Sequence, residues 1–212
     1  MNKSVYLIRH AESESNAGCA TSNFANIRLT AAGHVQAKSF AQDFAIVPSL
    51  IVTSSFLRAR QTAGYFSDLH KEVAVVEWPV HEFVFVTFPE SAATTRLQRK
   101  PTVDEYWKRN NPEEKNVGSE SFSEFWLRVK HVYDLVQRHR AETVVVFTHE
   151  FFMQAFTFGM AKQFPDCSAE IMSKLYAQSR STPMDNLSIR EFRFPIQTDQ
   201  VVDTGSCDDP TT

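Results

Sequence analysis

Short apolar runs alternate along the chain with segments whose apolar residues recur at helical spacing. Five runs rich in β-branched or aromatic residues predict buried strands, at residues 4–8, 49–53, 72–77, 143–147 and 186–194. Four segments predict helices, at residues 30–42, 57–67, 121–138 and 151–162. Because the two kinds of element alternate, the pattern predicts an α/β fold with a central, mostly parallel sheet flanked by helices.

Residues 78–118 lack a clear period, so they predict an inserted lid or cap region with short helices. Its aromatic residues form the core of a cap or else line a substrate site: Trp78, Phe83, Phe85, Phe88, Tyr106 and Trp107. Its cations form a solvated face or else attract an anion: Arg96, Arg99, Lys100, Lys108 and Arg109. We interpret residues 1–197 as a single domain that contains this cap, and the polar residues 198–212 as a disordered tail.

Charge and composition narrow the possible partners and the compartment. The 212 residues carry a formal net charge of −3, so we expect no broad basic field for nucleic acid or an anionic membrane. The apolar run at residues 5–8 is too short for a signal-peptide core, and no run is long enough to span a membrane. The three cysteines, Cys19, Cys167 and Cys207, are widely spaced and odd in number, which predicts reduced thiols in a cytoplasmic protein.

Charged and titratable residues follow four of the predicted strands, close to the point where each strand ends. They are Arg9 and His10 after the first strand, Arg58 after the second, His81 and Glu82 after the third, and His149 after the fourth. Ligands of open α/β sheets bind beyond the carboxyl ends of the strands. We therefore expect these side chains, which are remote in sequence, to converge on one crevice.

This set of side chains is suited to phosphoryl transfer. Guanidinium groups bind phosphate oxygens in a bidentate manner, a neutral imidazole is a competent nucleophile, and a carboxylic acid can protonate a leaving oxygen. Each residue alone has a plain structural alternative, such as a surface arginine, a buried structural histidine or a solvated loop carboxylate. Their joint placement favours the functional interpretation. No cluster has the spacing of metal ligands, so we expect neither a metal nor another cofactor.

Five motifs occur along the chain in a fixed order. They are the run LIRHAESESN at residues 7–16, Leu29-Thr30 with Gly33 and Gln36-Ala37, the run SFLRARQTA at residues 55–63, Gly118 with Glu120-Ser121, Phe125 and Arg128-Val129, and the run VVFTH at residues 145–149. Together they resemble the signature of the histidine phosphatase superfamily, which includes the cofactor-dependent phosphoglycerate mutases. The resemblance implies a phosphoglycerate mutase-like fold and catalysis through a phosphorylated histidine.

The resemblance also implies a role for each matching residue. His10 would attack phosphorus. The phosphoryl oxygens would be held by Arg9, Arg58 and His149, with help from Asn16. Glu82 would protonate the leaving oxygen and then activate water, although Glu77 and Glu90 are nearby rivals for this role.

Two residues depart from the superfamily pattern. Ala11 replaces the usual glycine after His10, which is a small change. Glu150 replaces the glycine after the second histidine. Its carboxylate either points to solvent or else repels highly anionic substrates or binds a substrate amine or hydroxyl.

We predict a metal-independent phosphatase that hydrolyses small phosphomonoesters through a phosphohistidine intermediate. The chain lacks the arginine-rich block that we expect in a glycolytic phosphoglycerate mutase, which favours hydrolysis over mutase activity. A mutase-like phosphotransferase and a non-catalytic sensor of a phosphorylated ligand are the alternatives. The sequence leaves the substrate and the oligomeric state open.

Overall fold

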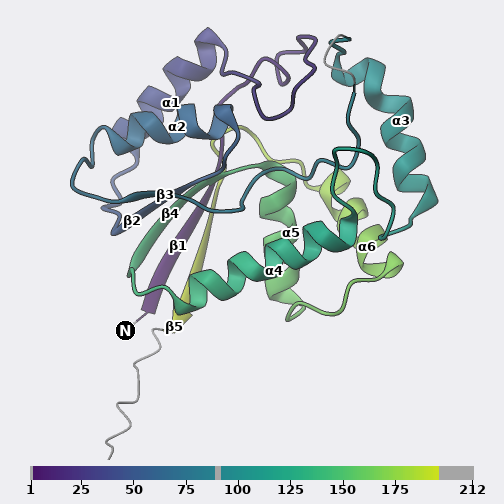
Figure 1. The fold of residues 1–212 in the computed structure, drawn as a ribbon. Helices are drawn as coiled ribbons and strands as arrows, with labels where there is room; N and C mark the ends of the chain where they lie inside the picture. The colour runs from purple at the N-terminus through teal and green to yellow at the C-terminus, as the bar shows by residue number, and fades with distance from the viewer. Residues whose placement is uncertain (1, 89–91, 196–212) are drawn as a thin grey trace, which may run out of the picture.

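In the computed structural model, which describes residues 2–88 and 92–195, five strands form one sheet with helices on both faces (Figure 1). The strands are β1 (Asn2–Arg9), β2 (Leu50–Thr53), β3 (Val75–Glu77), β4 (Thr143–Thr148) and β5 (Ile189–Pro195). Their order in the sheet is β3-β2-β4-β1-β5. All neighbours run parallel except β5, which is antiparallel to β1 at one edge. The predicted α/β fold with a mostly parallel sheet is confirmed.

Six helices accompany the sheet in the described residues, and four of them lie on its two faces (Figure 1). They are α1 (Ala31–Asp43), α2 (Leu57–Ser67), α3 (Arg96–Arg109), α4 (Phe122–Arg138), α5 (Glu150–Ala161) and α6 (Ala169–Ser181). The helices α1 and α2 lie on one face, α4 and α5 lie on the other, and α3 stands apart beyond one end of the sheet (Figure 1). None of the helices in the described ranges is both long enough and apolar enough to cross a membrane.

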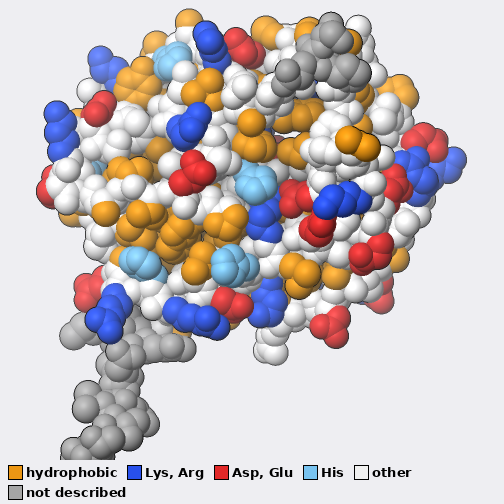
Figure 2. Space-filling model, in the orientation of Figure 1, with side chains coloured by type: hydrophobic (Ala, Val, Ile, Leu, Met, Phe, Trp, Pro, Cys, Tyr) orange, Lys and Arg blue, Asp and Glu red, His pale blue; other side chains and the backbone are white. Residues whose placement is uncertain are grey.

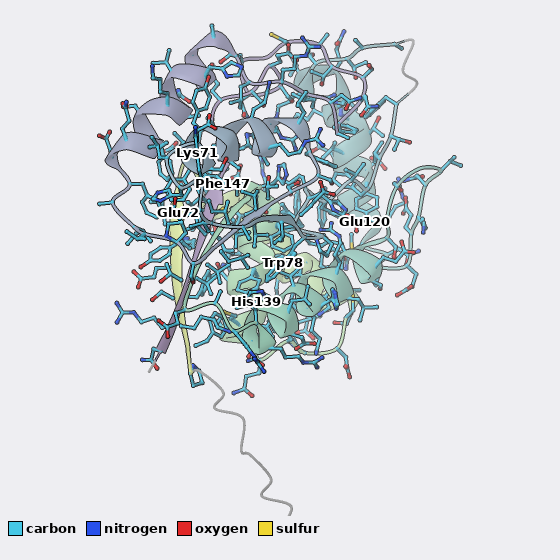
Figure 3. The ribbon with its side chains drawn as sticks, turned by 60° about the vertical axis from the view of Figure 1, so that its left-hand side comes forward. Lys71, Glu72, Trp78, Glu120, His139 and Phe147 are labelled. Atoms are coloured by element: carbon cyan, nitrogen blue, oxygen red, sulfur yellow. The ribbon has the colours of Figure 1, made fainter. Side chains whose placement is uncertain are left out.

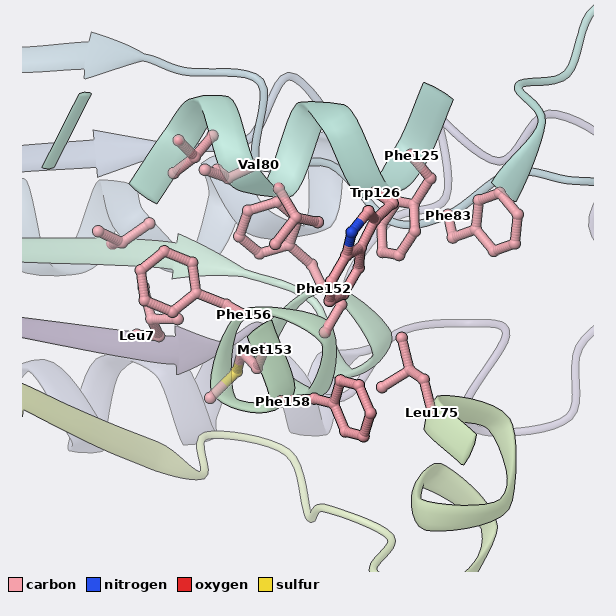
Figure 4. Close-up of a cluster of buried hydrophobic side chains, with 14 of the residues drawn as sticks. Leu7, Val80, Phe83, Phe125, Trp126, Phe152, Met153, Phe156, Phe158 and Leu175 are labelled. Atoms are coloured by element: carbon pink, nitrogen blue, oxygen red, sulfur yellow. The ribbon is translucent and has the colours of Figure 1, made fainter. Parts of the chain in front are cut away.

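The alternation of side chains along the strands produces two cores. In β4, Val144 and Val146 face α4 and α5, whereas Val145 and Phe147 face α1 and α2. The core on the α4 and α5 side is larger, and its side chains include Leu7, Val80, Phe83, Phe125, Trp126, Phe152, Met153, Phe156, Phe158 and Leu175 (Figure 4). Burial of each large apolar side chain contributes about 1.5–3 kcal/mol, so these two layers fix the sheet on which the site is built.

The start of α1 is joined to the loop that follows β1. Thr30 is the N-cap, as predicted, and its side-chain oxygen accepts a hydrogen bond from the Gly33 nitrogen at 2.9 Å. The Thr30 hydroxyl in turn donates to the Glu12 carboxylate at 2.6 Å. A Cβ at Gly33 would lie 2.0 Å from the Glu12 carbonyl oxygen, so only glycine allows this approach. The contact holds the loop just after His10.

A buried lysine joins β1 to the end of α4. The Lys3 side chain is 1% exposed, and its ammonium donates hydrogen bonds to the carbonyl oxygens of Val136, Gln137 and His139. These carbonyls belong to the last turn of a helix, where no intrahelical partner exists and where the helix dipole favours a cation. Lys3 therefore satisfies the end of α4 and anchors the helix to the sheet.

Some predicted elements differ in length from the observed ones. The strand expected at residues 72–77 is only Val75–Glu77, because β3 is an edge strand that pairs only with Ile51–Thr53 of β2. The predicted insertion contains one helix of 14 residues, α3, instead of several short helices. The helix α6 was not predicted at all. The predicted tail at residues 198–212 lies outside the described residues.

The surface shows no broad area of a single charge on the face that Figure 2 presents. Acidic and basic side chains are interspersed over this face, in keeping with the net charge of −3 (Figure 2). Two buried arginines, Arg9 and Arg58, instead place positive charge inside the molecule, near the carboxyl ends of the parallel strands.

Candidate active site

A cavity of about 590 Å³ opens where the parallel strands end. Arg9 is the last residue of β1, Arg58 lies in the first turn of α2 just after β2, and Glu150 opens α5 just after β4. The predicted residues that line the cavity are Arg9, His10, Asn16, Arg58 and Glu82. The fold thus brings together side chains from four separate parts of the sequence, as the strand-end argument predicts.

His10 is held in one tautomer and one orientation. Its Nδ1 lies 2.7 Å from the carbonyl oxygen of Ala11, which can only accept, so Nδ1 carries the proton. The lone pair is therefore on Nε2, which accepts a hydrogen bond from Arg58 Nε at 3.0 Å. Burial, and next the charge of Arg58, lower the pKa of His10 well below its usual 6.5. At neutral pH the ring is an uncharged imidazole with a directed lone pair.

The guanidinium of Arg58 is buried beside the His10 ring. It donates to His10 and, through Nη1, to the carbonyl oxygen of Phe24 at 2.7 Å. It also lies 5.1 Å from the ring centroid of Phe56, a cation–π distance. Burial lowers the pKa of Arg58 to about 10, so the group stays charged at neutral pH. A fixed cation at the nucleophilic nitrogen can bind the oxygens of a phosphoryl group placed there.

His149 lies behind His10 and is fully buried. The two imidazole centroids are 5.1 Å apart, and His149 Nε2 lies 2.8 Å from the Ser54 hydroxyl. Its Nδ1 has no hydrogen-bond partner among the described residues. Burial, and next the charge of Arg58, hold the pKa of His149 well below 6.5. Unlike the other predicted phosphate-binding residues, His149 does not line the cavity, so its contact with a phosphoryl oxygen stays a prediction.

Arg9 is held by groups that the sequence did not point to. Its Nη1 donates to the carbonyl oxygen of Met184, and its Nη2 lies 3.1 Å from Glu150 Oε2. The Glu150 carboxylate also accepts from the Met184 nitrogen at 3.0 Å and is 24% exposed. Glu150 therefore does not point to solvent: it lies in the cavity wall and neutralises part of the charge on Arg9.

This contact predicts the effect of removing Glu150. Glu150→Gly restores the residue expected from the superfamily pattern and removes the carboxylate that competes with a phosphoryl group for Arg9. We expect inorganic phosphate or vanadate to inhibit this variant about 10-fold more tightly, equal to about 1.4 kcal/mol. Glu150→Gln should show most of the gain, because it keeps the shape and removes the charge. The measurement is the inhibition constant at fixed ionic strength.

The control for this prediction is Glu191→Gln, an exposed carboxylate of β5 that pairs with Arg193 at 3.0 Å. It makes the same change in net charge far from the cavity lining and should leave the inhibition constant unchanged. Unchanged or weaker inhibition of Glu150→Gly would show that Arg9 does not need to be freed from Glu150 to bind an anion.

Glu82 is the carboxylate that the structure places with His10. One of its oxygens accepts from the Phe83 nitrogen at 3.0 Å and the other accepts from the Phe151 nitrogen at 3.3 Å. Burial raises its pKa, and the charge of Arg58 opposes that rise. Glu77 is exposed at the end of β3 and does not line the cavity, whereas Glu90 lies outside the described residues. A carboxyl group with a raised pKa in the cavity can serve as a proton donor.

The loop that carries Glu82 is tied to α4 by Arg128. The guanidinium donates to the carbonyl oxygens of Pro79 at 2.9 Å and His81 at 2.8 Å, and it forms an ion pair with Glu120. These bonds fix the backbone on both sides of Val80, whose own carbonyl oxygen accepts from the Thr148 hydroxyl at 2.6 Å. Arg128 does not line the cavity, so its hydrogen bonds act on the site by positioning the loop that carries Glu82.

Removal of these bonds should move the carboxyl group of Glu82 and impair proton donation. For Arg128→Gln we expect kcat on an alkyl phosphate to fall on the order of 10-fold to 100-fold, the usual result of a misplaced catalytic group. The loss on p-nitrophenyl phosphate should be smaller, because that leaving group needs no proton. Arg128→Lys should recover part of the rate. Arg193→Gln on the surface is the control, and equal losses on both substrates would indicate general damage instead.

Two asparagines join the loop after His10 to the segment before β5. Asn16 Oδ1 accepts from the Ser13 nitrogen at 3.2 Å, from the Ser13 hydroxyl at 2.9 Å and from Asn186 Nδ2 at 3.3 Å. Asn186 Nδ2 also donates to the His10 carbonyl oxygen at 2.8 Å. Sequence reasoning missed Asn186, Ser54 and Met184 in this site, since nothing in their local pattern distinguishes them from loop residues.

The insertion contributes to the cavity in part. Phe83, Phe85, Phe88, Trp107, Arg96, Arg99 and Lys100 line it. Tyr106 is fully buried, whereas Lys108 and Arg109 form ion pairs with Glu105 and Glu114 outside the cavity. Trp78 lies away from it beside His139, with ring centroids 5.8 Å apart (Figure 3). His81 also lies outside the cavity lining, where its ring packs on Phe56 at 5.5 Å.

A metal site is not apparent from the donor set. Within residues 2–88 and 92–195, no group of three or more His, Cys, Asp or Glu side chains is arranged to hold a metal ion. The charged side chains that line the cavity with His10 include the guanidinium groups of Arg9 and Arg58 and the carboxyl groups of Glu82 and Glu150. This arrangement can bind a phosphoryl group, attack it through an imidazole and protonate the departing oxygen.

Comparison with known proteins identifies a relative by sequence and solved structures with a similar fold. "Putative phosphoserine phosphatase 2" of Hydrogenobacter thermophilus is 28% identical over 148 residues, which is 69% of this chain and 73% of that protein. The structure of a mycobacterial glucosyl-3-phosphoglycerate phosphatase superposes with a TM-score of 0.66 at 21% identity, covering 89% of this chain and 92% of that one. A phosphoserine phosphatase of Entamoeba histolytica gives a TM-score of 0.63 at 20% identity, covering 90% of each chain.

The family itself follows from the length of the sequence match. The profile of the histidine phosphatase superfamily (branch 1) matches residues 5–196, a range that runs from β1 past the end of β5 and includes every residue of the cavity. This chain belongs to branch 1 of the histidine phosphatase superfamily.

Proposed function

We propose that this protein is a phosphatase that hydrolyses phosphomonoesters through a phosphohistidine intermediate on His10. The observation that carries the proposal is the fixed tautomer of His10: Nδ1–H is bonded to Ala11, and the Nε2 lone pair is directed at Arg58. A phosphoryl group bound by that guanidinium meets the lone pair. Glu82 lies in the same cavity with a raised pKa, as a proton donor requires.

The first half of the proposed reaction transfers the phosphoryl group to the protein. The Nε2 lone pair of His10 forms a bond to phosphorus while the bond from phosphorus to the ester oxygen breaks. The proton of Glu82 passes to that oxygen, and the alcohol leaves. Arg9 and Arg58, with help from Asn16, hold the three remaining oxygens, whose charge the two guanidiniums stabilise.

The second half returns the protein to its starting state. The carboxylate of Glu82 takes a proton from a water molecule, whose oxygen forms a bond to phosphorus as the bond to His10 Nε2 breaks. Inorganic phosphate leaves, and both His10 and Glu82 regain their initial protonation states. The low pKa of His10 supports this cycle, because a neutral imidazole is needed for each new attack.

A phosphotransferase of the mutase type is the second candidate. It would use the same first step but would pass the phosphoryl group to a substrate hydroxyl instead of water. The relatives described above are named as phosphatases, which favours hydrolysis. Incubation with 3-phosphoglycerate or 2,3-bisphosphoglycerate separates the two, since release of inorganic phosphate supports a phosphatase and isomer exchange without release supports a mutase. A sensor would give neither product.

Hydrolysis should not depend on an added metal ion. Arg9 and Arg58 already supply two positive charges at the phosphoryl site, the task that a metal ion performs in other phosphatases. We expect a strong chelator to leave the rate of phosphate release from p-nitrophenyl phosphate within about 2-fold of the untreated rate, a small difference on the scale of catalytic effects. A loss of activity that magnesium or zinc restores would contradict this proposal.

The cytoplasmic location is also a proposal. Cys19 and Cys167 are free thiols in the part of the chain that the structure describes, and Cys19 is exposed. Thiols persist in reducing compartments, which is what supports this location.

A further inference from the structure

The cavity has a charged end and an apolar end. His10, Arg58 and Glu82 form the charged end, which has room for a phosphoryl group. Aromatic side chains line much of the remainder, among them Phe24, Phe85, Phe88, Trp107, Phe151 and Tyr176. A volume of about 590 Å³ is in the range of sites that enclose drug-sized ligands, so it greatly exceeds the needs of a phosphoryl group on a small alcohol.

The aromatic end is built in two layers. Tyr106 is fully buried behind Phe85, with centroids 4.4 Å apart, and it does not line the cavity. Trp107 stacks on Tyr176 of α6 at 4.2 Å with an interplanar angle of 6°, and the rings of Phe85 and Phe151 lie 5.4 Å and 5.5 Å from it. Phe85, Phe151 and Tyr176 are partly buried and pack against the core, and Trp107 is a buried member of that core. These rings are therefore held in place and can stack on a flat ligand at little entropic cost.

The guanidinium of Arg99 makes cation–π contacts with two of these rings. Its guanidinium lies 5.2 Å from the centroid of Phe24 and 5.9 Å from that of Phe88. One nitrogen, Nη1, donates to both the carbonyl and the hydroxyl oxygen of Thr21, at 3.2 and 3.1 Å. Arg99 is 5% exposed, and its other terminal nitrogen, Nη2, donates to the Ser15 hydroxyl at 3.5 Å, so both terminal nitrogens have partners within the protein.

We infer that the alcohol half of the substrate is a bulky, flat, apolar group that stacks in the aromatic end while its phosphate meets His10. The inference rests on the proposed phosphatase function. It names arylalkyl phosphates, and phosphomonoesters of similar apolar character, as the preferred substrate class over small polar phosphates. Of the charged side chains in this part of the lining, Asp104 and Lys100 pair with each other, and Arg96 and Arg180 lie at the first turn of α3 and the last turn of α6.

The test compares substrates with equal chemistry and different alcohol groups. The values of kcat/KM are measured for 2-phenylethyl phosphate and for ethyl phosphate. Both release a primary alcohol, so the two leaving groups need a proton from Glu82 to a similar degree. The ratio of their kcat/KM values therefore measures the contribution of contacts with the aromatic end of the cavity. We expect the ratio to favour 2-phenylethyl phosphate ~10-fold or more, the usual effect of burying an apolar group of this size. O-phosphoserine should resemble ethyl phosphate.

Substitutions in the aromatic end of the cavity test whether its side chains cause the preference for 2-phenylethyl phosphate. Phe24→Ala and Tyr176→Ala should each lower the ratio several-fold, about the effect of losing part of an aromatic contact. The control is Phe192→Ala on β5, a partly buried ring that packs on Phe156 at 5.2 Å and does not line the cavity. It should keep the wild-type ratio. Thermal unfolding of each variant identifies any that fail to fold.

The outcomes separate this inference from the function on which it rests. Phosphoenzyme and product from both substrates, with a ratio near or below one, would overturn the substrate class and leave the phosphatase in place. If all three variants, including the control Phe192→Ala, lowered the ratio equally, the aromatic side chains of the cavity would not be the cause of the substrate preference. Failure to hydrolyse any of the three substrates or p-nitrophenyl phosphate would overturn both.

Discussion

His10→Ala is expected to abolish the phosphoenzyme and to lower kcat ~10⁴-fold or more, as loss of a covalent nucleophile does. Among the described residues, the groups next to the His10 ring are engaged in other contacts. Arg58 donates its Nε hydrogen to the His10 lone pair, and Glu82 accepts two backbone hydrogen bonds, so neither offers a nucleophile in the position of Nε2. His149 is fully buried behind His10 and does not line the cavity.

The measurement is rapid quench with labelled substrate. A phosphohistidine is labile to acid and stable to alkali, whereas an acyl phosphate on a carboxylate is labile to alkali. His34→Ala is the matched control, because His34 lies on α1, pairs with the Tyr65 hydroxyl at 3.2 Å and does not line the cavity. It should retain adduct and rate. Near-native turnover in His10→Ala, or an alkali-labile adduct in the wild type, would rule out the mechanism.

The fold and the candidate site differ in how far the sequence predicts them. The strands β1, β2 and β4 are buried on both faces, so their sequences are continuous apolar runs that can be recognised locally. Arg9 ends β1, His149 directly follows β4, and Arg58 lies in the first turn of the helix after β2. A parallel sheet brings such ends together whatever their separation in sequence. That is why the central part of the site could be predicted without coordinates.

The parts that could not be predicted depend on tertiary contacts. The helix α6 has a recognisable signal, with Ser168 as its N-cap and apolar residues at 171, 172, 175 and 176. Its mean character is polar, however, and only packing on α5 explains its place. The bonds from Asn186 to His10 and from Arg9 to Met184 join residues more than 170 positions apart. No local pattern reports such a pair.

The direction of the Glu150 side chain could not be predicted from the sequence either. The sequence identified it as a departure from the superfamily pattern and left its direction open between solvent and substrate. Its place in the first turn of α5, beside the end of β1, brings its carboxylate to Arg9. The direction of one side chain thus depends on the strand order, which no single segment encodes.

Glu82→Gln is the second change for which we expect a large effect. A general acid matters in proportion to the need of the leaving group for a proton. An alkoxide is a very poor leaving group when unprotonated, whereas p-nitrophenolate leaves without help. Hydrolysis of an alkyl phosphate should therefore fall on the order of 10²-fold or more, the usual size of acid catalysis. The loss on p-nitrophenyl phosphate should be much smaller when the first chemical step is measured.

The pH dependence of the rate is an independent test of the acid role of Glu82. Burial raises the pKa of Glu82, so its protonated form persists to higher pH than that of an ordinary carboxyl group. The rate on an alkyl phosphate should fall as the pH rises through that raised pKa, because the acid is lost. His10 must be neutral to attack, and its pKa lies well below 6.5, so the acid side of the profile should stay flat down to that range. In Glu82→Gln the alkaline decrease should disappear.

Single-turnover rates are the measurement that decides the role of Glu82. In steady state, slow hydrolysis of the phosphoenzyme can hide the contrast between the substrates, because Glu82 is also proposed to activate the water. Glu77→Gln is the matched control, since Glu77 is an exposed carboxylate at the end of β3 that does not line the cavity. It should behave as the wild type on both substrates. Equal losses of Glu82→Gln on the alkyl and the nitrophenyl ester would remove Glu82 from the acid role, and the same pair of substrates applied to Glu77→Gln and Glu90→Gln would then show which carboxyl group holds it.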